Sequence, residues 1–85
     1  MVNAGNANAF TGKAGDKAVE ESTRAIAQAL GCPRNEVFMA STGVIGQPLD
    51  WEKIVAVVPT LIKAAREDGW NAAAASIMTT DTFPK

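Results

Sequence analysis

Residues 36–58 read EVFMASTGVIGQPLDWEKIVAVV and place three elements in succession. The run Glu36–Ser41 is short and apolar, so we predict a buried β-strand there. Thr42–Gln47 holds two glycines around an apolar pair, a pattern typical of a tight turn. Asp50 is then a suitable N-cap for a helix that we expect to run to about Arg66. This order of elements predicts a mixed fold of strand and helix.

Two further segments have the pattern of helices. Asp16–Leu30 repeats apolar residues at spacings of three and four, which places them on one helical face. Gly31 and Pro33 end this helix, because glycine suits a helix C-terminus and proline cannot continue the helix. Residues 70–78 are rich in Ala and predict a third helical segment. We therefore predict an α+β fold, with two longer helices and a short one around at least one buried strand.

The first fifteen residues, MVNAGNANAFTGKAG, alternate Gly and Asn and favour turns over regular structure. Gly5 and Gly12-Lys13 partly match a phosphate-binding P-loop. That match fails, because six residues separate the two glycines and Ala14 replaces the Ser or Thr that would bind magnesium. We therefore predict a loop here without a nucleotide site.

The composition is that of a packed chain with a small core. Of its 85 residues, 47% are hydrophobic and 20% are charged, which argues against disorder. Large apolar anchors are few, with three Phe, two Trp and no Tyr. A domain of this size removes only about 60% of its unfolded surface from water, so its isolated stability would be marginal. We therefore expect the chain to be part of a larger protein.

Charge and residue types exclude several functions. The eight Lys and Arg residues are scattered among nine Asp and Glu, without the basic patch that nucleic-acid binding requires. With no His and Cys32 as the only Cys, this chain alone can form neither a Ser-His-Asp triad nor an intramolecular disulfide, and a zinc site is not expected. No apolar run reaches the ~20 residues of a membrane span, and no signal peptide is visible. We expect a cytoplasmic protein without a resident cofactor, a metal, a nucleic-acid partner or a membrane partner.

Two polar segments are the candidates for chemistry. Thr42-Gly43, at the end of the predicted strand, could present a hydroxyl and a backbone N–H to a cleft, as an oxyanion hole requires. An ordinary turn, in which Gly43 supplies a positive φ, explains the same pattern. Residues 79–82, TTDT, group four small polar side chains that could bind a substrate carboxylate or amide, or could cap a turn. The residues alone leave both choices open.

Three stretches of the chain resemble the signatures of one enzyme family. Asn3–Ala9, with Thr11-Gly12, is similar to the NSGNANA-x-TG signature of the ornithine acetyltransferase (glutamate N-acetyltransferase) family. Ser41–Gly46 matches the STGVIG segment of this family, and Met78–Lys85 matches its MTTDT-x-PK segment. The three motifs lie in the family's order and together span nearly the whole chain, so the resemblance is specific.

The resemblance implies transfer of an acetyl group from N-acetylornithine to glutamate in arginine biosynthesis, with acetyl-CoA as a further acetyl donor in some members. Family precursors cleave themselves into two chains before a threonine, which then acts as the nucleophile with its own amine as base. The two chains stay together in a helix–sheet–sheet–helix sandwich, often as an α2β2 assembly. Residues 1–85 would be a partial domain of the first (α) chain and would depend on the remainder of the precursor, including the β chain.

By position, the resemblance assigns roles to three residues. Thr42 and Gly43 match the pair that forms the oxyanion hole, and Thr79 matches a substrate-binding threonine. The three polar residues after Thr79 are interpreted as its support, and the Asn-rich loop as architecture near the site.

The chain also departs from the family pattern. Ala4 stands where Ser is usual, and Phe10 stands where a small residue or Cys is common. The segment with the cleavage site and the nucleophilic threonine would follow Lys85. We therefore expect these 85 residues to be inactive alone.

Two other functions stay open. An N-terminal-nucleophile aminopeptidase of the same broad fold would hydrolyse amides, although the Asn-rich and TTDT motifs favour the transferase. A non-catalytic helical binding module, whose polar motifs are only turns, would fold alone as a soluble monomer.

Overall fold

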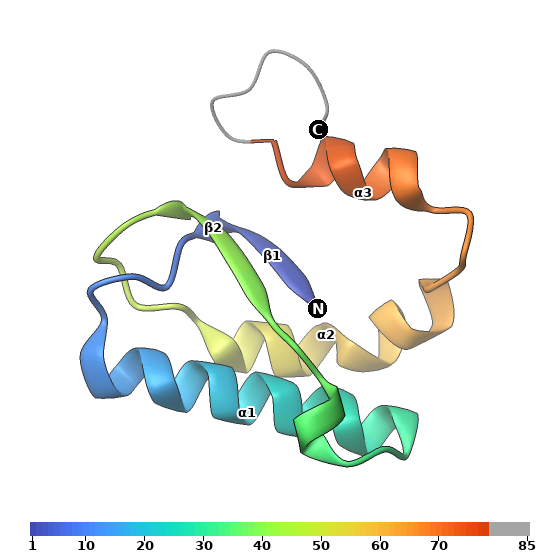
Figure 1. The fold of residues 1–85 in the computed structure, drawn as a ribbon, viewed down its shortest axis with the longest axis horizontal. Helices are drawn as coiled ribbons and strands as arrows, with labels where there is room; N and C mark the ends of the chain where they lie inside the picture. The colour runs from blue at the N-terminus through green and yellow to red at the C-terminus, as the bar shows by residue number, and fades with distance from the viewer. Residues whose placement is uncertain (79–85) are drawn as a thin grey trace.

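Two parallel strands lie over one pair of helices in the computed structural model, which describes residues 1–78 (Figure 1). In chain order the elements are β1 (Val2–Asn6), α1 (Gly12–Leu30), the 3₁₀ turn η1 (Arg34–Glu36), β2 (Ala40–Val44), α2 (Trp51–Ala64) and α3 (Trp70–Ser76). The register of the two strands runs from Val2 opposite Ala40 to Asn6 opposite Val44. The chain therefore leaves one strand, passes through α1 and returns in a parallel strand beside it.

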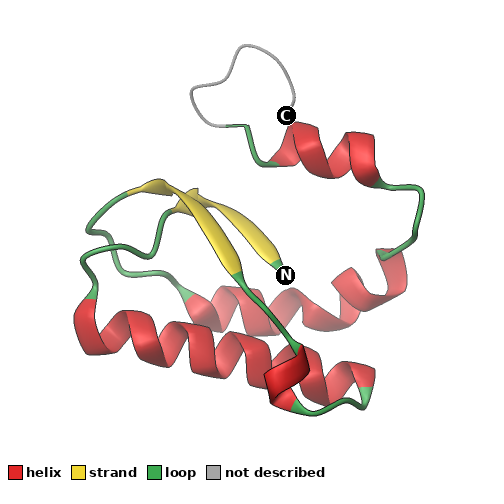
Figure 2. Cartoon of the chain, in the orientation of Figure 1, coloured by secondary structure: helices red, strands yellow, loops and turns green. Residues whose placement is uncertain are grey.

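α1 and α2 contact each other on one side of the sheet (Figure 2). The buried face of α1 carries mostly small side chains, namely Gly15, Ala18, Ser22, Thr23, Ile26 and Ala27. Val58 of α2 and Leu49, which precedes α2, complete the buried set. Because the side chains at a helix contact set the distance between the helices, this face lets α2 approach closely. The core is accordingly thin, as the shortage of large anchors predicts.

The helical predictions and the α+β class are confirmed. α1 ends at Gly31, whose φ of 71° is left-handed and whose N–H donates to the carbonyl oxygen of Ala27. Asp50 caps α2, since its side chain accepts a hydrogen bond from the N–H of Lys53 at 3.4 Å. α2 continues through Pro59 to Ala64.

The strands differ from the prediction in place and in burial. Residues 2–6, predicted as loop, form β1. The strand predicted over 36–41 is replaced by η1 and by β2, which starts only at Ala40. Within residues 1–78 this strand is not buried: Val44 is 56% exposed, and Phe38 before it is 81% exposed. Thr42, predicted to open a turn, lies within the strand.

Glycines inside the strands explain why the sequence pattern misplaces them. Gly5 and Gly43 face each other in the register, with φ of 121° and 130°. Glycine reaches this region without the steric penalty that other residues meet. Residues that usually mark turns therefore lie in a parallel ladder. α1 likewise begins at Gly12, four residues before the predicted Asp16.

α3 stands apart from the α1–α2 pair, beyond the end of α2 (Figure 1). Its first residue, Trp70, is 80% exposed. No helix within residues 1–78 has the length and apolar character that crossing a membrane requires.

Candidate active site

Thr42 lies at the centre of β2, between two backbone hydrogen bonds that join this strand to β1. Two residues before it, the N–H of Ala40 donates to the carbonyl oxygen of Met1 at 2.9 Å. Two residues after it, the carbonyl oxygen of Val44 accepts from the N–H of Ala7 at 2.9 Å. Backbone groups point alternately to the two sides of a strand, so the N–H of Thr42 also points to β1. Thr42 can therefore offer a ligand its hydroxyl rather than its amide.

Gly43 has the opposite orientation. The same alternation turns its N–H away from β1, toward an edge of β2 that is free within residues 1–78. A Cβ atom on Gly43 would lie 2.6 Å from the carbonyl oxygen of Gly5 and 2.8 Å from the backbone nitrogen of Asn6. The position therefore has no room for a side chain. Thr42 and Gly43 together supply two neighbouring donors of different kinds, a hydroxyl and an amide.

The two faces of the sheet differ in exposure. Side chains alternate between faces along a strand, so Thr42 shares its face with Val44 and, across the register, with Val2. Both valines are more than half exposed. Asn3 and Ser41, which lie on the other face, are half-buried. The Thr42 hydroxyl thus belongs to the more open face of the sheet.

An amide side chain joins the two strands one step before Thr42. Ser41 faces Asn3 in the register, and the Ser41 hydroxyl donates to Oδ1 of Asn3. The Nδ2 group of Asn3 donates to the carbonyl oxygen of Asn6 at 3.3 Å. Asn3 thereby holds Ser41 with one end of its amide. The Nδ2 end, bonded to Asn6, bridges Ala4 and Gly5, the two residues of β1 that lie opposite Thr42 and Gly43.

The loop after β1, residues 7–11, is attached both to the chain that leaves β2 and to α1. The N–H of Gly46 donates to the carbonyl oxygen of Ala9 at 2.8 Å. Asn8 has a left-handed φ of 55°. Its Oδ1 accepts from the Thr11 hydroxyl at 2.9 Å, and its Nδ2 donates to the carbonyl oxygen of Gly15 at 3.3 Å. These bonds fix the loop beside the segment that follows Gly43.

The remaining predicted site residue, Thr79, lies outside the described residues, as do the three polar residues after it.

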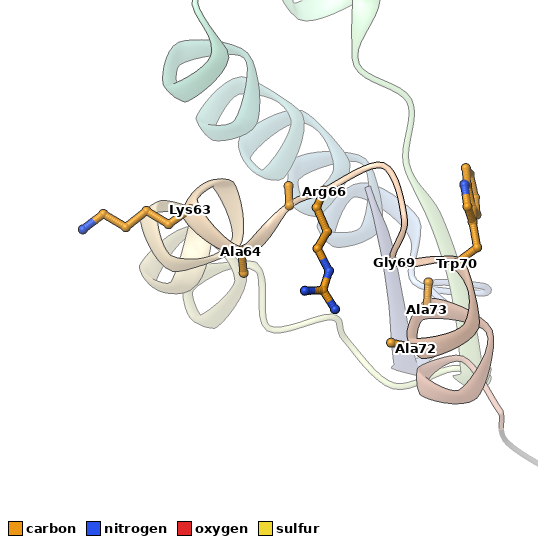
Figure 3. Close-up of a pocket in the computed structure, with 8 residues that line it drawn as sticks. Lys63, Ala64, Arg66, Gly69, Trp70, Ala72 and Ala73 are labelled. Atoms are coloured by element: carbon orange, nitrogen blue, oxygen red, sulfur yellow. The ribbon is translucent and has the colours of Figure 1, made fainter.

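A hollow of about 740 Å³ lies between the end of α2 and α3, where Arg66 extends between the two helices (Figure 3). Arg66 is paired there with Asp68, with 3.2 Å between Nε and Oδ1. Neither Thr42 nor Gly43 lines this hollow, so its size does not make it part of the candidate site. Within residues 1–78, no cluster of three or more His, Cys, Asp or Glu side chains could hold a metal ion.

Sequence reasoning did not find the contact between Asn3 and Ser41. Its one available signal is the abundance of small and polar residues over 2–6 and 40–44, which becomes informative only when both segments are treated as paired strands. Because glycine and asparagine are depleted in strands, composition argues against that treatment.

Comparison with known proteins places these features in one family. Residues 1–85, the whole chain, match the family model described as the ArgJ family. The chain belongs to the ArgJ family. It is 55% identical over 85 residues to the arginine biosynthesis bifunctional protein ArgJ of Gluconobacter oxydans (strain 621H), and equally to that of Rhizobium meliloti (strain 1021). It covers 20% and 21% of these two proteins, so it spans about a fifth of the length of the curated relatives it matches.

A solved ArgJ structure has the same fold. The crystal structure of arginine biosynthesis bifunctional protein ArgJ from Bacillus halodurans at 2.00 Å resolution matches with a TM-score of 0.79 and 32% sequence identity. The match covers 96% of this chain and 43% of the solved chain. The family resemblance read from the three motifs is therefore confirmed, and the α+β arrangement is one that ArgJ proteins share.

Proposed function

We propose that this chain is a segment of an acyltransferase of arginine biosynthesis that transfers an acetyl group from N-acetylornithine to glutamate. The observation that carries the proposal is the 55% identity, over the whole chain, to relatives named arginine biosynthesis bifunctional protein ArgJ. The two substrates are proposed because the three motifs resemble the signatures of the ornithine acetyltransferase family.

Thr42 and Gly43 form the oxyanion hole of this reaction. When a nucleophile attacks the acetyl carbonyl, negative charge develops on its oxygen. Fixed donors that face this oxygen lower the barrier by roughly 3–4 kcal/mol each. Two features support the assignment: the hydroxyl of Thr42 lies on the open face of the sheet, and the alternation of the strand turns the N–H of Gly43 away from β1. A paired strand also holds both donors in place before the substrate binds.

The nucleophile is a threonine outside this chain, at an N-terminus created when the precursor cleaves itself. Its hydroxyl attacks the acetyl carbonyl while the threonine's own amine takes the hydroxyl proton. The bond to the ornithine nitrogen then breaks, ornithine leaves with that proton on its nitrogen, and the acetyl group remains as an ester on the threonine oxygen. The amine of glutamate then attacks this ester, which releases N-acetylglutamate and restores the hydroxyl. The same donors serve both steps, because each passes through a tetrahedral oxyanion.

The lengths of the matched proteins support cleavage into two chains. This chain covers 43% of the solved polypeptide but only 20% of the Gluconobacter oxydans relative. The solved polypeptide is therefore about half as long as that relative, as separation of a precursor into two chains would produce.

The other family expectations belong to the same proposal. Residues 1–85 are part of the α chain, Thr79 contacts the acetylated substrate, and the remainder of the precursor, including the β chain, completes an α2β2 assembly. The enzyme works in the cytoplasm without a resident cofactor, and acetyl-CoA is a possible second acetyl donor. The 85 residues alone are inactive.

The test uses a chimera, defined as the Gluconobacter oxydans relative with its matching segment replaced by residues 1–85. We expect the chimera to transfer acetyl from N-acetylornithine to glutamate and the isolated 85 residues to show no transfer. Hydrolysis of amino-acid amides without transfer would favour the aminopeptidase. A chimera that folds but performs neither reaction would contradict the enzyme assignment and favour a binding module.

A further inference from the structure

We propose that Asn3 is a positioning residue for the oxyanion hole, which it acts on through Ser41 and through its own strand. This inference rests on the proposed function, because it gives Asn3 a role in the same reaction. The two hydrogen bonds of the Asn3 amide go to the Ser41 hydroxyl and to the carbonyl oxygen of Asn6. Asn3 therefore acts on the two proposed donors through their neighbours.

The site needs such a residue because of the glycine pair. Gly5 and Gly43 occupy one step of the ladder, both with positive φ. Glycine has the greatest backbone freedom of any residue, so at this step the conformation depends on strand pairing and on the neighbouring residues. Neither glycine has a side chain that could contact the other strand. The placement of the Gly43 amide, a proposed oxyanion donor, therefore depends on the residues around this step.

Asn3 restrains that step through one contact with β2 and one contact within β1. Its Oδ1 holds Ser41, the residue directly before Thr42. Its Nδ2 reaches past Ala4 and Gly5 to the carbonyl oxygen of Asn6, at 3.3 Å, and so bridges the glycine step within β1. On the far side, the bond from the N–H of Ala7 to Val44 closes the ladder at 2.9 Å.

The placement of Asn3 suits this role. It is half-buried on the face of the sheet opposite the Thr42 hydroxyl, so its amide competes less with water and does not reach the substrate face. Loss of the Asn3 amide is therefore expected to misplace the donors without removing any group that binds substrate. A misplacement of about 1 Å can lower turnover by about 100-fold.

The experiment measures kcat and KM of the chimera for N-acetylornithine in Asn3→Ala, Ser41→Ala and the double variant. We expect each single variant to lower kcat by about 10- to 100-fold while KM changes by less than about 3-fold. The double variant should be about as slow as the slower single one, because both changes break one connection. Ser41→Thr keeps the hydroxyl and should restore most of the turnover. Asn35→Ala, at an exposed position of η1, is the matched control and should leave both constants unchanged.

A second readout separates positioning from a loss of folded protein. A phosphonamidate analogue of N-acetylornithine imitates the tetrahedral intermediate. Its affinity should fall in Asn3→Ala by the same factor as kcat, while the affinity for substrate is kept. An unchanged kcat, a rise in KM alone, or additive effects in the double variant would overturn the inference. If Asn3→Ala does not fold, Ser41→Ala decides the matter by the same criteria.

Failure of the proposed function would look different, because the parent chimera would then transfer no acetyl group. Failure of the oxyanion-hole assignment alone would look different again. Thr42→Ala in the chimera would then be as active as the parent, whatever Asn3 does. In that case Thr42 is no oxyanion donor, and the proposed effect of Asn3 on catalysis is contradicted as well. Hydrogen exchange of the Thr42 amide, expected to be about 10-fold faster in Asn3→Ala than in Asn35→Ala, would still show whether Asn3 holds β2.

Discussion

Gly5 and Gly43 face each other at one step of the parallel sheet, and a Cβ atom on Gly43 would lie 2.6 Å from the carbonyl oxygen of Gly5. The two positions are not equivalent, because a Cβ atom on Gly5 would meet nothing within 4 Å. Of the two glycines, only Gly43, which carries the proposed oxyanion donor, has no room for a side chain.

This asymmetry predicts different outcomes for the same substitution. Gly43→Ala adds a backbone clash to an unfavourable positive φ, so the strands must separate locally. Gly5→Ala meets only the cost of the positive φ, about 1–3 kcal/mol. In the chimera we expect Gly43→Ala to lower the thermal midpoint more than Gly5→Ala and to abolish acetyl transfer. Equal shifts in the two variants would contradict the close approach of the strands at this step.

Thr42→Ala should reduce kcat of the chimera by about 100-fold or more, because one of the two oxyanion donors is lost. Thr42→Ser keeps the hydroxyl and should retain most of the activity. Steady-state kinetics with N-acetylornithine and glutamate measure both. If Thr42→Ala turns over at the parent rate, Thr42 has no part in the mechanism.

Thr79→Ala should mainly raise KM for the acetylated substrate, since the family motif assigns this residue to substrate binding. The same kinetic assay measures this change, with kcat as the internal control. A large loss of folded protein, seen as a lower yield of soluble chimera, would mark Thr79 as structural instead.

Ser22 is fully buried on α1, and among the described residues its hydroxyl has no hydrogen-bond partner. An unsatisfied buried hydroxyl is unfavourable, and Ala has the better helix propensity, so Ser22→Ala should leave α1 as stable or up to about 1 kcal/mol more stable. Thr23→Ala is the control, because the Thr23 hydroxyl donates to the carbonyl oxygen of Val19 at 2.8 Å. Hydrogen exchange of α1 amides should slow or stay constant in the first variant and accelerate in the second. Destabilisation by Ser22→Ala would reveal a partner for the hydroxyl.

Asp50→Ala should destabilise the first turn of α2 by about 1 kcal/mol, because the N–H of Lys53 loses its acceptor. Asp50→Asn keeps an acceptor oxygen and should cost much less. Glu52→Ala, in the first turn of α2 and exposed, controls for charge near the helix N-terminus. Hydrogen exchange in residues 51–55 measures the difference, and equal exchange in all three variants would remove Asp50 as a cap.

The sequence predicts the helices well and the sheet poorly, for a physical reason. α1 and α2 bury one face against a partner, so their apolar residues repeat with the helical period, and Gly31 and Asp50 mark ends by local geometry. β1 has no such pattern. It is made mostly of Asn, Ala and Gly, and its stability comes from pairing with residues 38 positions away. The motif match finds Thr42 and Gly43, but which donor each can offer depends on the register, which no local pattern encodes.

The crossover through α1 also has a kinetic consequence. Every pairing in the sheet joins residues 38 positions apart, whereas the helices form from contacts within a few residues. Closing so long a loop is entropically costly until α1 has folded and shortened the distance between the strand ends. We therefore expect the ladder around Thr42 to assemble last, so that the two proposed donors come into position only in a chain whose helices are already in place.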